Sequence, residues 1–135
     1  MRNFIRHPTD IPLTFTLKES ESEAGCIHGR GQGGLCFDTD MALAEGAPIH
    51  IEIPLSYPPF SAKGCVAWCR PEGELYNIGV CFDDQSTLFN LRMVEQVCHI
   101  EHYRKEVLEK DGRQLSEEEA AREWVEKFAD KFPSH

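Results

Sequence analysis

The sequence predicts a small, mainly β domain in which six antiparallel strands close into a barrel and two helices follow at the C-terminal end. Two observations support this fold class. Short segments with alternating apolar and polar residues recur through residues 11–82, separated by turns that contain glycine or proline. The apolar residues that follow have the three-to-four-residue spacing of amphipathic helices. A length of 135 residues suits one domain with one core.

The first half of the expected barrel contains three strands and a glycine-rich turn. Residues 1–10 carry mainly polar and charged side chains and predict a loop. Residues 11–17 alternate and carry a proline near their start, where a missing backbone N–H is tolerated. We expect a short strand at residues 25–28, a tight turn at residues 29–34 and a strand at residues 35–39.

Three further strands complete the expected barrel. Residues 48–55 alternate again. Residues 60–70 form the longest strand candidate, in which regular alternation places Val66 and Trp68 on the same face. A short turn then leads to residues 75–82, which we expect to pair back as a hairpin.

Two helices are predicted after the barrel. The first spans residues 86–111, and Gly112 suits the left-handed position after a helix end. Its apolar stripe is expected to contain Phe89, Met93, Val97, Ile100, Tyr103 and Val107. Ser116 and Glu119 fit the capping box that begins the second helix. Its apolar face contains Ala121, Trp124, Val125, Phe128 and Phe132. We expect this face to pack against the first helix or the barrel, since it is too apolar to leave in water.

Charge and hydropathy exclude several classes of partner. The formal net charge of −9 opposes general binding to DNA, RNA or anionic membranes, because these partners require a basic surface. No apolar run approaches the roughly 20 residues needed to cross a bilayer. The N-terminal residues are too polar for a signal peptide. We therefore expect a cytoplasmic protein that binds neither a nucleic acid polymer nor a membrane.

The six cysteines do not suggest catalysis or metal binding. In a reducing cytosol a buried cysteine behaves as a small apolar residue, and we expect that role here. The chain has no C-x-x-C pair and no usual zinc spacing, so no metal site and no cofactor is predicted. His99 and His102, near Cys98, are expected on the surface of the first helix. No nucleophile motif or carboxylate pair is apparent, so we expect that the chain is not an enzyme.

Two arginines and the glycine-rich turn are the most unusual features of the sequence. Arg2 and Arg6 precede the first predicted strand, and the segment G-R-G-Q-G-G-L-C-F begins at Gly29. In this order and at this separation, they resemble the two motifs of the PilZ domain family, R-x-x-x-R followed by [D/N]-x-S-x-x-G. The segments G-C-V-A-W from Gly64 and N-I-G-V-C-F from Asn77 resemble later strands of that family.

The second motif departs from the family pattern. Gly29 and Gly31 stand where the family has Asp or Asn and Ser, and Gly34 keeps the motif's residue type. Each lost hydrogen bond to a nucleotide is worth about 0.5–3 kcal/mol. The backbone groups of the glycines remain available and permit close approach of a ligand. Arg30, inside the turn, adds a third cation.

The resemblance covers about residues 2–95 and implies a PilZ-like barrel domain over residues 1–95, including the start of the first helix. Residues 96–135 would then form a C-terminal helical extension packed on the same domain. The resemblance further implies a bacterial single-domain receptor or adaptor for the second messenger cyclic di-GMP, with a protein effector as its other partner. The ligand-binding residues expected on this basis are Arg2, Arg6, His7, Gly29, Arg30, Gly31 and Gly34.

Two functions remain open on the sequence, and different residues favour each. Arg2 and Arg6 favour cyclic di-GMP binding, because guanidinium groups form paired hydrogen bonds to phosphate oxygens and to the guanine edge. Gly29 and Gly31 favour the alternative, a degenerate PilZ domain that has lost the nucleotide and acts as a protein–protein interaction module. The downstream partner, the oligomeric state and the role of the C-terminal helices are left undetermined by the sequence.

Overall fold

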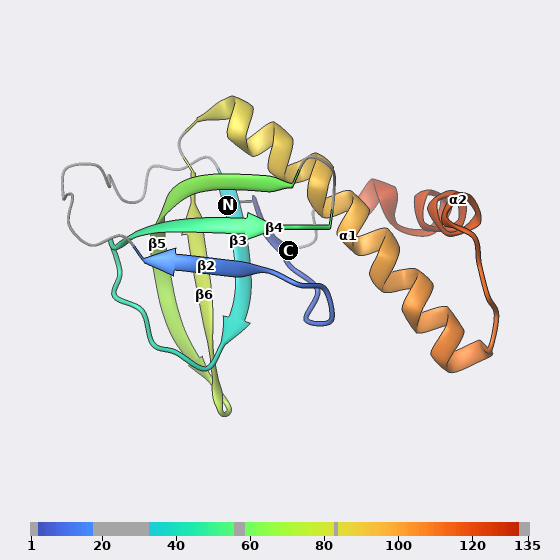
Figure 1. Cartoon of the computed structure of the whole chain (residues 1–135), viewed down its shortest axis with the longest axis horizontal. Coiled ribbons are helices and arrows are strands. Elements are labelled where there is room, and N and C mark those ends of the chain that lie inside the picture. The colour runs from blue at the N-terminus through green and yellow to red at the C-terminus, as the bar shows by residue number, and fades with distance from the viewer. Residues whose placement is uncertain (1–2, 18–32, 56–58, 83, 133–135) are drawn as a thin grey trace.

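The computed structural model describes residues 3–17, 33–55, 59–82 and 84–132 (Figure 1). Strands come first and helices last, as the sequence predicts. The strands are β1 (Asn3–Arg6), β2 (Thr14–Leu17), β3 (Gly33–Thr39), β4 (Pro48–Ile53), β5 (Phe60–Glu72) and β6 (Leu75–Cys81). The helices are α1 (Gln85–Asp111) and α2 (Glu117–Phe128), followed by the 3-10 turn η2 (Ala129–Lys131).

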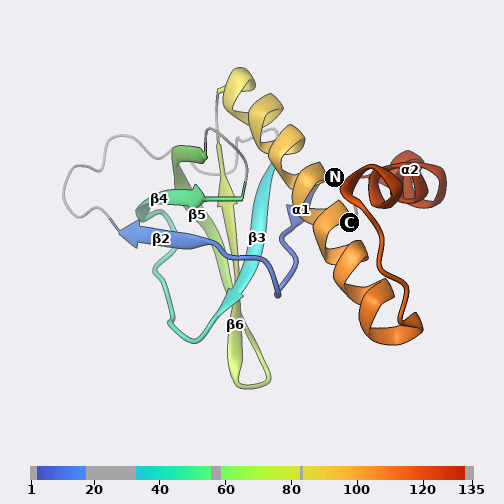
Figure 2. The same ribbon diagram turned by 45° about the vertical axis from the view of Figure 1, so that its right-hand side comes forward.

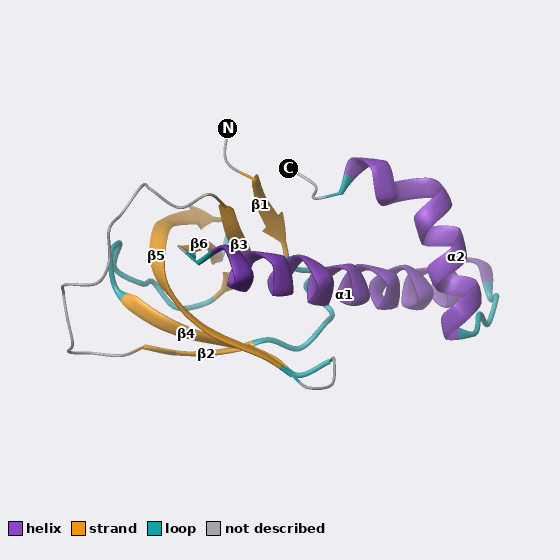
Figure 3. Cartoon of the chain, turned by 90° about the horizontal axis from the view of Figure 1, so that it is seen from above, coloured by secondary structure: helices purple, strands orange, loops and turns teal. Residues whose placement is uncertain are grey.

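The six strands form one mixed, open sheet, so the predicted closed antiparallel barrel is wrong in two respects. The strand order is β1-β3-β6-β5-β4-β2, and β1 pairs with β3 in parallel. The other four pairings are antiparallel. Strands β1 and β2 occupy opposite edges, and no ladder within the described ranges joins them. Because β1 and β2 do not pair with each other, the curled sheet stays open between these two edges (Figures 1 and 3).

Strand β1 was not predicted, since residues 1–10 were expected to form a loop. Its hydrogen-bonding partner is β3, about thirty residues away, and local patterning cannot reveal such a pairing. Phe4 and Ile5 are adjacent and both buried, so one packs on each face of the sheet. The structure has six strands, as predicted, but β1 is one of them and was not expected. The strand expected at residues 25–28 lies outside the described residues.

A β-bulge in β5 changes the direction of one side chain that matters for the site. The ladder to β6 is regular on both sides but shifts between Val66 and Trp68. Val66 pairs with Val80 and is buried in the core, whereas Trp68 pairs with Gly79 on the opposite face. The prediction that Val66 and Trp68 share a face is wrong, because a bulge inserts one extra residue and inverts the alternation after it.

The main core lies between the inner face of the sheet and the first half of α1. The strands contribute Leu35, Phe37, Ile49, Ile51, Ile53, Val66, Ile78 and Val80, Phe82 adds to them directly after β6, and the helix contributes Leu91 and Cys98. Figure 2 shows α1 beginning against the sheet and extending beyond it towards α2. The N-terminal half of α1 is thus part of the sheet domain, and its C-terminal half carries α2 away from the strands.

The buried face of α1 differs from the predicted stripe. Tyr103 and Val107 are buried as expected, but Phe89, Met93 and Val97 are exposed. The face that meets the sheet is formed by Leu91, Glu95 and Cys98. These positions also have helical spacing, but the glutamate among them conceals the face from any criterion based on hydrophobicity.

Both predicted helix boundaries are confirmed by their caps. Gly112 has φ 68° and its N–H bonds to the Leu108 carbonyl. Ser116 and Glu119 form the reciprocal capping box of α2. Helix α2 covers the end of α1 through a second small core made of Tyr103, Val107, Leu115, Ala120 and Trp124. Val125 and Phe128, predicted to belong to the packing face, are exposed.

The state of the cysteines and the hydropathy of the helices can be compared with the sequence predictions. Cys36, Cys69 and Cys98 are free thiols, as expected, but Cys65 is disulfide-bonded, which corrects the expectation of reduced cysteines at that position. None of the helices in the described part of the chain is sufficiently long and apolar to span a bilayer.

Candidate functional site

Arg6 lies at the end of β1 on the outer face of the sheet, opposite the main core. The parallel register places it beside Cys36 of β3. Its side chain is half exposed, and its guanidinium lies 3.8 Å from Glu72 Oε1 at the end of β5. An ion pair this long and exposed contributes at most about 1 kcal/mol. The guanidinium can therefore exchange Glu72 for an anionic ligand at small cost.

Trp68 lies on the same outer face because of the bulge in β5. Its indole covers Gly79, where an added Cβ would lie 2.5 Å from the ring. The ring of Phe4, from β1, packs against it with a centroid separation of 4.6 Å. The guanidinium of Arg70 lies 4.5 Å from the centroid of the indole. Arg70 thus stacks on the indole of Trp68, and Phe4 packs against the same indole at an interplanar angle of 54°.

A polar chain runs beside this stack. Trp68 Nε1 donates a hydrogen bond to Asn77 Oδ1 at 2.8 Å, and Asn77 Nδ2 donates to Asp38 Oδ1 at 3.1 Å. The register of β3, β6 and β5 aligns Asp38, Asn77 and Arg70 across the three strands. These bonds fix the indole and leave the carboxylate of Asp38 half-buried at the surface.

We call six of these residues the outer-face cluster: Arg6, Asp38, Trp68, Arg70, Glu72 and Asn77. It combines two guanidinium groups, an aromatic surface and carboxylate acceptors. Guanidinium groups bind phosphate oxygens and stack on bases, and carboxylates accept hydrogen bonds from the N–H groups of a base. Such a set can recognise a small, anionic, aromatic ligand such as a nucleotide. It contains no pairing of nucleophile and base that would indicate catalysis.

The structure places three of the seven residues predicted for the site. Arg6 is in the outer-face cluster. Gly34 lies within β3, where an added Cβ would overlap the Val80 carbonyl oxygen of β6 and touch the Phe4 ring, so the close approach of the β6 backbone requires glycine there. His7 lies elsewhere, as described below. The remaining four, Arg2, Gly29, Arg30 and Gly31, lie outside the described residues.

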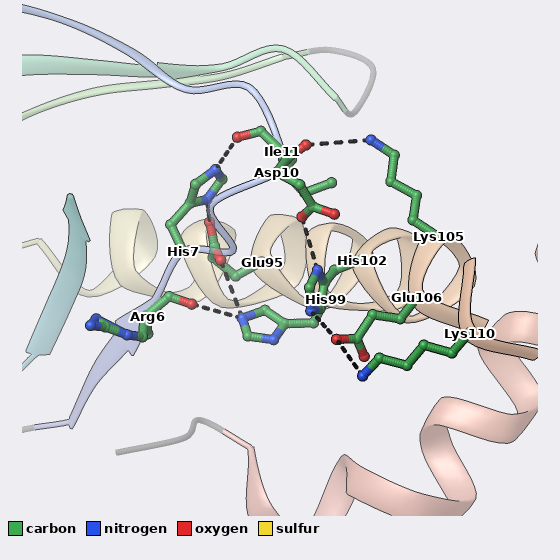
Figure 4. Close-up of polar contacts among 10 residues, drawn as sticks. All are labelled: Arg6, His7, Asp10, Ile11, Glu95, His99, His102, Lys105, Glu106 and Lys110. Atoms are coloured by element: carbon green, nitrogen blue, oxygen red, sulfur yellow. Dashed lines mark hydrogen bonds and ion pairs between the residues drawn. The ribbon is translucent and has the colours of Figure 1, made fainter. Parts of the chain in front are cut away.

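His7 is buried on the side of β1 that faces α1, away from the outer-face cluster. Its Nδ1 lies 2.6 Å from Glu95 Oε2, and its Nε2 lies 2.8 Å from the Ile11 carbonyl oxygen (Figure 4). Burial by itself lowers the pKa of His7, but the hydrogen bond and negative charge of Glu95 outweigh it, and the net pKa is raised. A proton therefore sits between the imidazole and the carboxylate, and the pair is held tightly.

Further contacts fasten the chain after β1 to the same helix (Figure 4). His99 Nε2 bonds to the Arg6 carbonyl oxygen at 2.9 Å, and His102 Nδ1 bonds to Asp10 Oδ1 at 2.9 Å. Lys105 donates to the Asp10 carbonyl oxygen at 3.3 Å. The backbone of Arg6 is thus fixed from the helix side while its side chain points to the outer face.

The cluster around His7 also contains the donors most suited to a metal among the described residues. His7, Glu95 and Cys98 each offer one donor atom, and these three atoms lie within 4.8 Å of one another. All three residues are buried. Burial, and secondarily the charge of Glu95, raise the pKa of the Cys98 thiol. The thiol is therefore protonated in the metal-free protein.

Sequence reasoning missed Asp38, Trp68, Arg70, Glu72 and Asn77 as site residues. Alternation does put Arg70 on the face of Trp68, and Asn77 on the face of Gly79. No sequence signal, however, reveals the bulge that turns this face outward. The convergence of His7 with Glu95, which is 88 residues away, had no signal either.

Comparison with known proteins gives one family. A family model described as the PilZ domain matches residues 1–96, well over half of the chain. The matched segment covers the whole sheet and the first part of α1. No curated protein and no solved structure matches the chain.

Proposed function

The chain belongs to the PilZ domain family, and from this premise we propose that it binds cyclic di-GMP on the outer face of its sheet, beside Arg6. The proposal makes it a receptor or adaptor in bacterial second-messenger signalling, acting without catalysis. The ligand would contact Arg6 and the stack of Trp68 and Arg70 on one side. By resemblance, Arg2 and the glycine-rich turn would contact it on the other.

One observation carries the proposal. Arg6, the second arginine of the R-x-x-x-R motif, lies on the same exposed face of the sheet as Arg70, which stacks on the indole of Trp68. The chain as a whole carries a net charge of −9, so it repels a dianionic nucleotide unless cations are concentrated locally. Arg6 and Arg70 supply two such cations, and the carboxylates of Glu72 and Asp38 lie in the same cluster. Trp68 and the guanidinium planes supply the flat surfaces on which guanine bases stack.

Arg6→Ala tests the proposal. Loss of a charge-assisted hydrogen bond to phosphate costs about 1.5–3 kcal/mol, so cyclic di-GMP affinity should fall by roughly ten- to hundred-fold in calorimetric titration. The melting temperature should stay within about 1 °C of the wild type, because the long ion pair to Glu72 is the only bond that the Arg6 side chain makes within the described residues.

Arg122→Ala provides the control, since Arg122 is an exposed arginine on α2, away from the outer face. It removes the same charge and should leave affinity unchanged. Equal losses of affinity in both variants would show that overall charge, and not the Arg6 site, governs binding. Unchanged affinity in Arg6→Ala would remove Arg6 from the site.

A protein-binding function without nucleotide is the second candidate, favoured by exposed apolar surface on the helices. Phe89, Met93 and Val97 are exposed along one side of α1. In addition, a pocket of about 310 Å³ lies between α1 and α2, and the aromatic side chains of Trp124 and Phe128 form part of its lining. Absence of binding in wild-type protein, with binding gained by Gly29→Asp combined with Gly31→Ser, would favour this degenerate form of the domain.

A further inference from the structure

Three metal-binding donor types meet inside the protein, at the junction of the sheet and α1. Glu95 and Cys98 are one helical turn apart on the buried face of α1, and His7 approaches them from the chain after β1. Their side chains are 4% exposed for His7 and 0% for both helix residues. Nitrogen, oxygen and sulfur donors in one group match the ligands that zinc takes in proteins.

The surroundings of His7 resemble those of a metal ligand. Its Nε2 is directed at the Ile11 carbonyl oxygen at 2.8 Å. A histidine that binds a metal through one nitrogen commonly donates its other N–H to a backbone carbonyl, which fixes the tautomer and the ring orientation. The hydrogen bond to Ile11 therefore leaves Nδ1, which shares a proton with Glu95, as the nitrogen that a metal can bind once that proton is displaced.

Glu95 provides an independent sign of an additional ligand. Its Oε2 meets His7, but its Oε1 is buried and has no hydrogen-bond partner among the described residues. His99 Nε2 lies 3.6 Å from Oε1, and that nitrogen is already bonded to the Arg6 carbonyl oxygen. A buried carboxylate oxygen with no partner is costly, and few occur in native proteins.

We propose that His7, Glu95 and Cys98 form a binding site for a divalent transition metal of the zinc class. Donors around a tetrahedral zinc ion lie about 3.3–3.8 Å apart, given zinc–ligand distances of about 2.0–2.3 Å. The three donors here lie within 4.8 Å of one another, so shifts of about 1 Å enclose the ion. A water molecule takes the fourth position.

The charges balance only when the metal replaces protons. Zinc binding displaces the proton shared by His7 and Glu95 and the proton of the Cys98 thiol. The resulting carboxylate and thiolate neutralise the two positive charges, as a buried site requires. Binding therefore releases protons to solvent and strengthens as pH rises. A cavity of about 300 Å³ reaches one of the three donors, since His7 lines it together with Pro8 and Ile11.

A metal at this position would tie the chain after β1 to α1, next to the backbone of Arg6. The inference does not depend on cyclic di-GMP binding, since the ligands are buried and lie away from the outer-face cluster. Metal binding and nucleotide binding can each be present without the other, so the two proposals succeed or fail separately.

Cobalt and zinc titrations of the chelator-treated full chain, with its disulfide intact, test this site. Co²⁺ should bind with one equivalent and give the near-ultraviolet thiolate-to-cobalt absorption, which Zn²⁺ should then abolish by displacement. Zn²⁺ should also raise the melting temperature. Cys98→Ala should remove the thiolate absorption and weaken Zn²⁺ affinity by more than about 100-fold. Circular dichroism checks that this small substitution leaves the fold intact.

Cys69→Ala is the matched control, because Cys69 is a partly buried free thiol on β5 that lies outside the donor group. It should leave the cobalt spectrum and the zinc affinity unchanged. Absence of the thiolate absorption in wild-type protein overturns the proposal without reference to any variant. An absorption that persists in Cys98→Ala also overturns the proposal. In either case, His7 and Glu95 are only a buried pair that shares a proton.

Discussion

At Gly79, the absence of a side chain allows the indole of Trp68 to lie against the sheet. An added Cβ would lie 2.5–2.6 Å from three carbon atoms of that ring. The ring cannot move aside freely, because Phe4 packs on it, Arg70 stacks on it and Asn77 accepts its N–H. A single glycine thereby supports the aromatic part of the outer-face cluster.

Gly79→Ala should displace Trp68 and destabilise the protein. Inserting a methyl group into a well-packed site costs about 1–3 kcal/mol. Denaturant titration measures that cost, and the fluorescence of Trp68 in a Trp124→Phe background reports the displacement. Lys63→Ala, an exposed change on β5, the strand that carries Trp68, should alter stability by less than about 0.5 kcal/mol. Unaltered Trp68 fluorescence in Gly79→Ala would show that the indole does not depend on this glycine.

At the scale of elements, α1 joins two cores that have different partners. Its first half packs on the sheet through Leu91 and Cys98, and its second half packs on α2 through Tyr103 and Val107. The direction that α2 takes is set by the end of α1 at Gly112 and by the capping box at Ser116. Short local signals thus determine where the second core forms.

Ser116→Ala should destabilise α2 by removing its cap. The Ser116 hydroxyl accepts from the Glu119 N–H, and the Glu119 side chain accepts from the Ser116 N–H. Replacing an N-cap serine by alanine costs about 0.5–2 kcal/mol, whereas aspartate caps about as well as serine. Thermal melts should show a lower melting temperature for Ser116→Ala and little change for Ser116→Asp. Equal melting temperatures for all three proteins would mean that the box does not limit stability.

At the scale of the whole molecule, the sheet core does not need α2, since none of its members comes from that helix. Helix α2 instead shields the second half of α1, where Tyr103 and Val107 are buried beneath Trp124. The proposed nucleotide site and the second core lie on different parts of the molecule. Ligand binding and self-association can therefore be separated experimentally.

Truncation before Ser116 should expose the end of α1 and promote association. The β signal in circular dichroism and any cyclic di-GMP binding should survive, because the sheet, Arg6 and Trp68 remain. Analytical ultracentrifugation measures the association, and full-length Val125→Ala, an exposed change on α2, should stay unaltered. A truncated chain that remains monomeric with its stability intact would show that α2 does not cover α1 in solution. The apolar side chains of α2 would then be expected to contact a partner protein.

Much of this protein could be predicted from local sequence patterns. Strands β3, β4, β5 and β6, both helices, the Gly112 end and the Ser116 capping box follow from alternation, helical spacing and turn residues. The family also followed from its motifs, and the match over residues 1–96 confirms it. Each of these signals is contained within a few neighbouring residues, so no knowledge of the three-dimensional arrangement is needed.

Only the tertiary structure decided the features that depend on distant contacts. Strand β1 exists because β3 supplies its hydrogen bonds, and Trp68 faces outward because a bulge reverses the alternation of β5. Glu95 is buried, against every expectation for a glutamate, because His7 meets it from the other end of the chain. Hydrophobic spacing cannot reveal a buried polar pair, since the stabilising partner of each residue comes from a separate segment that only folding brings into contact.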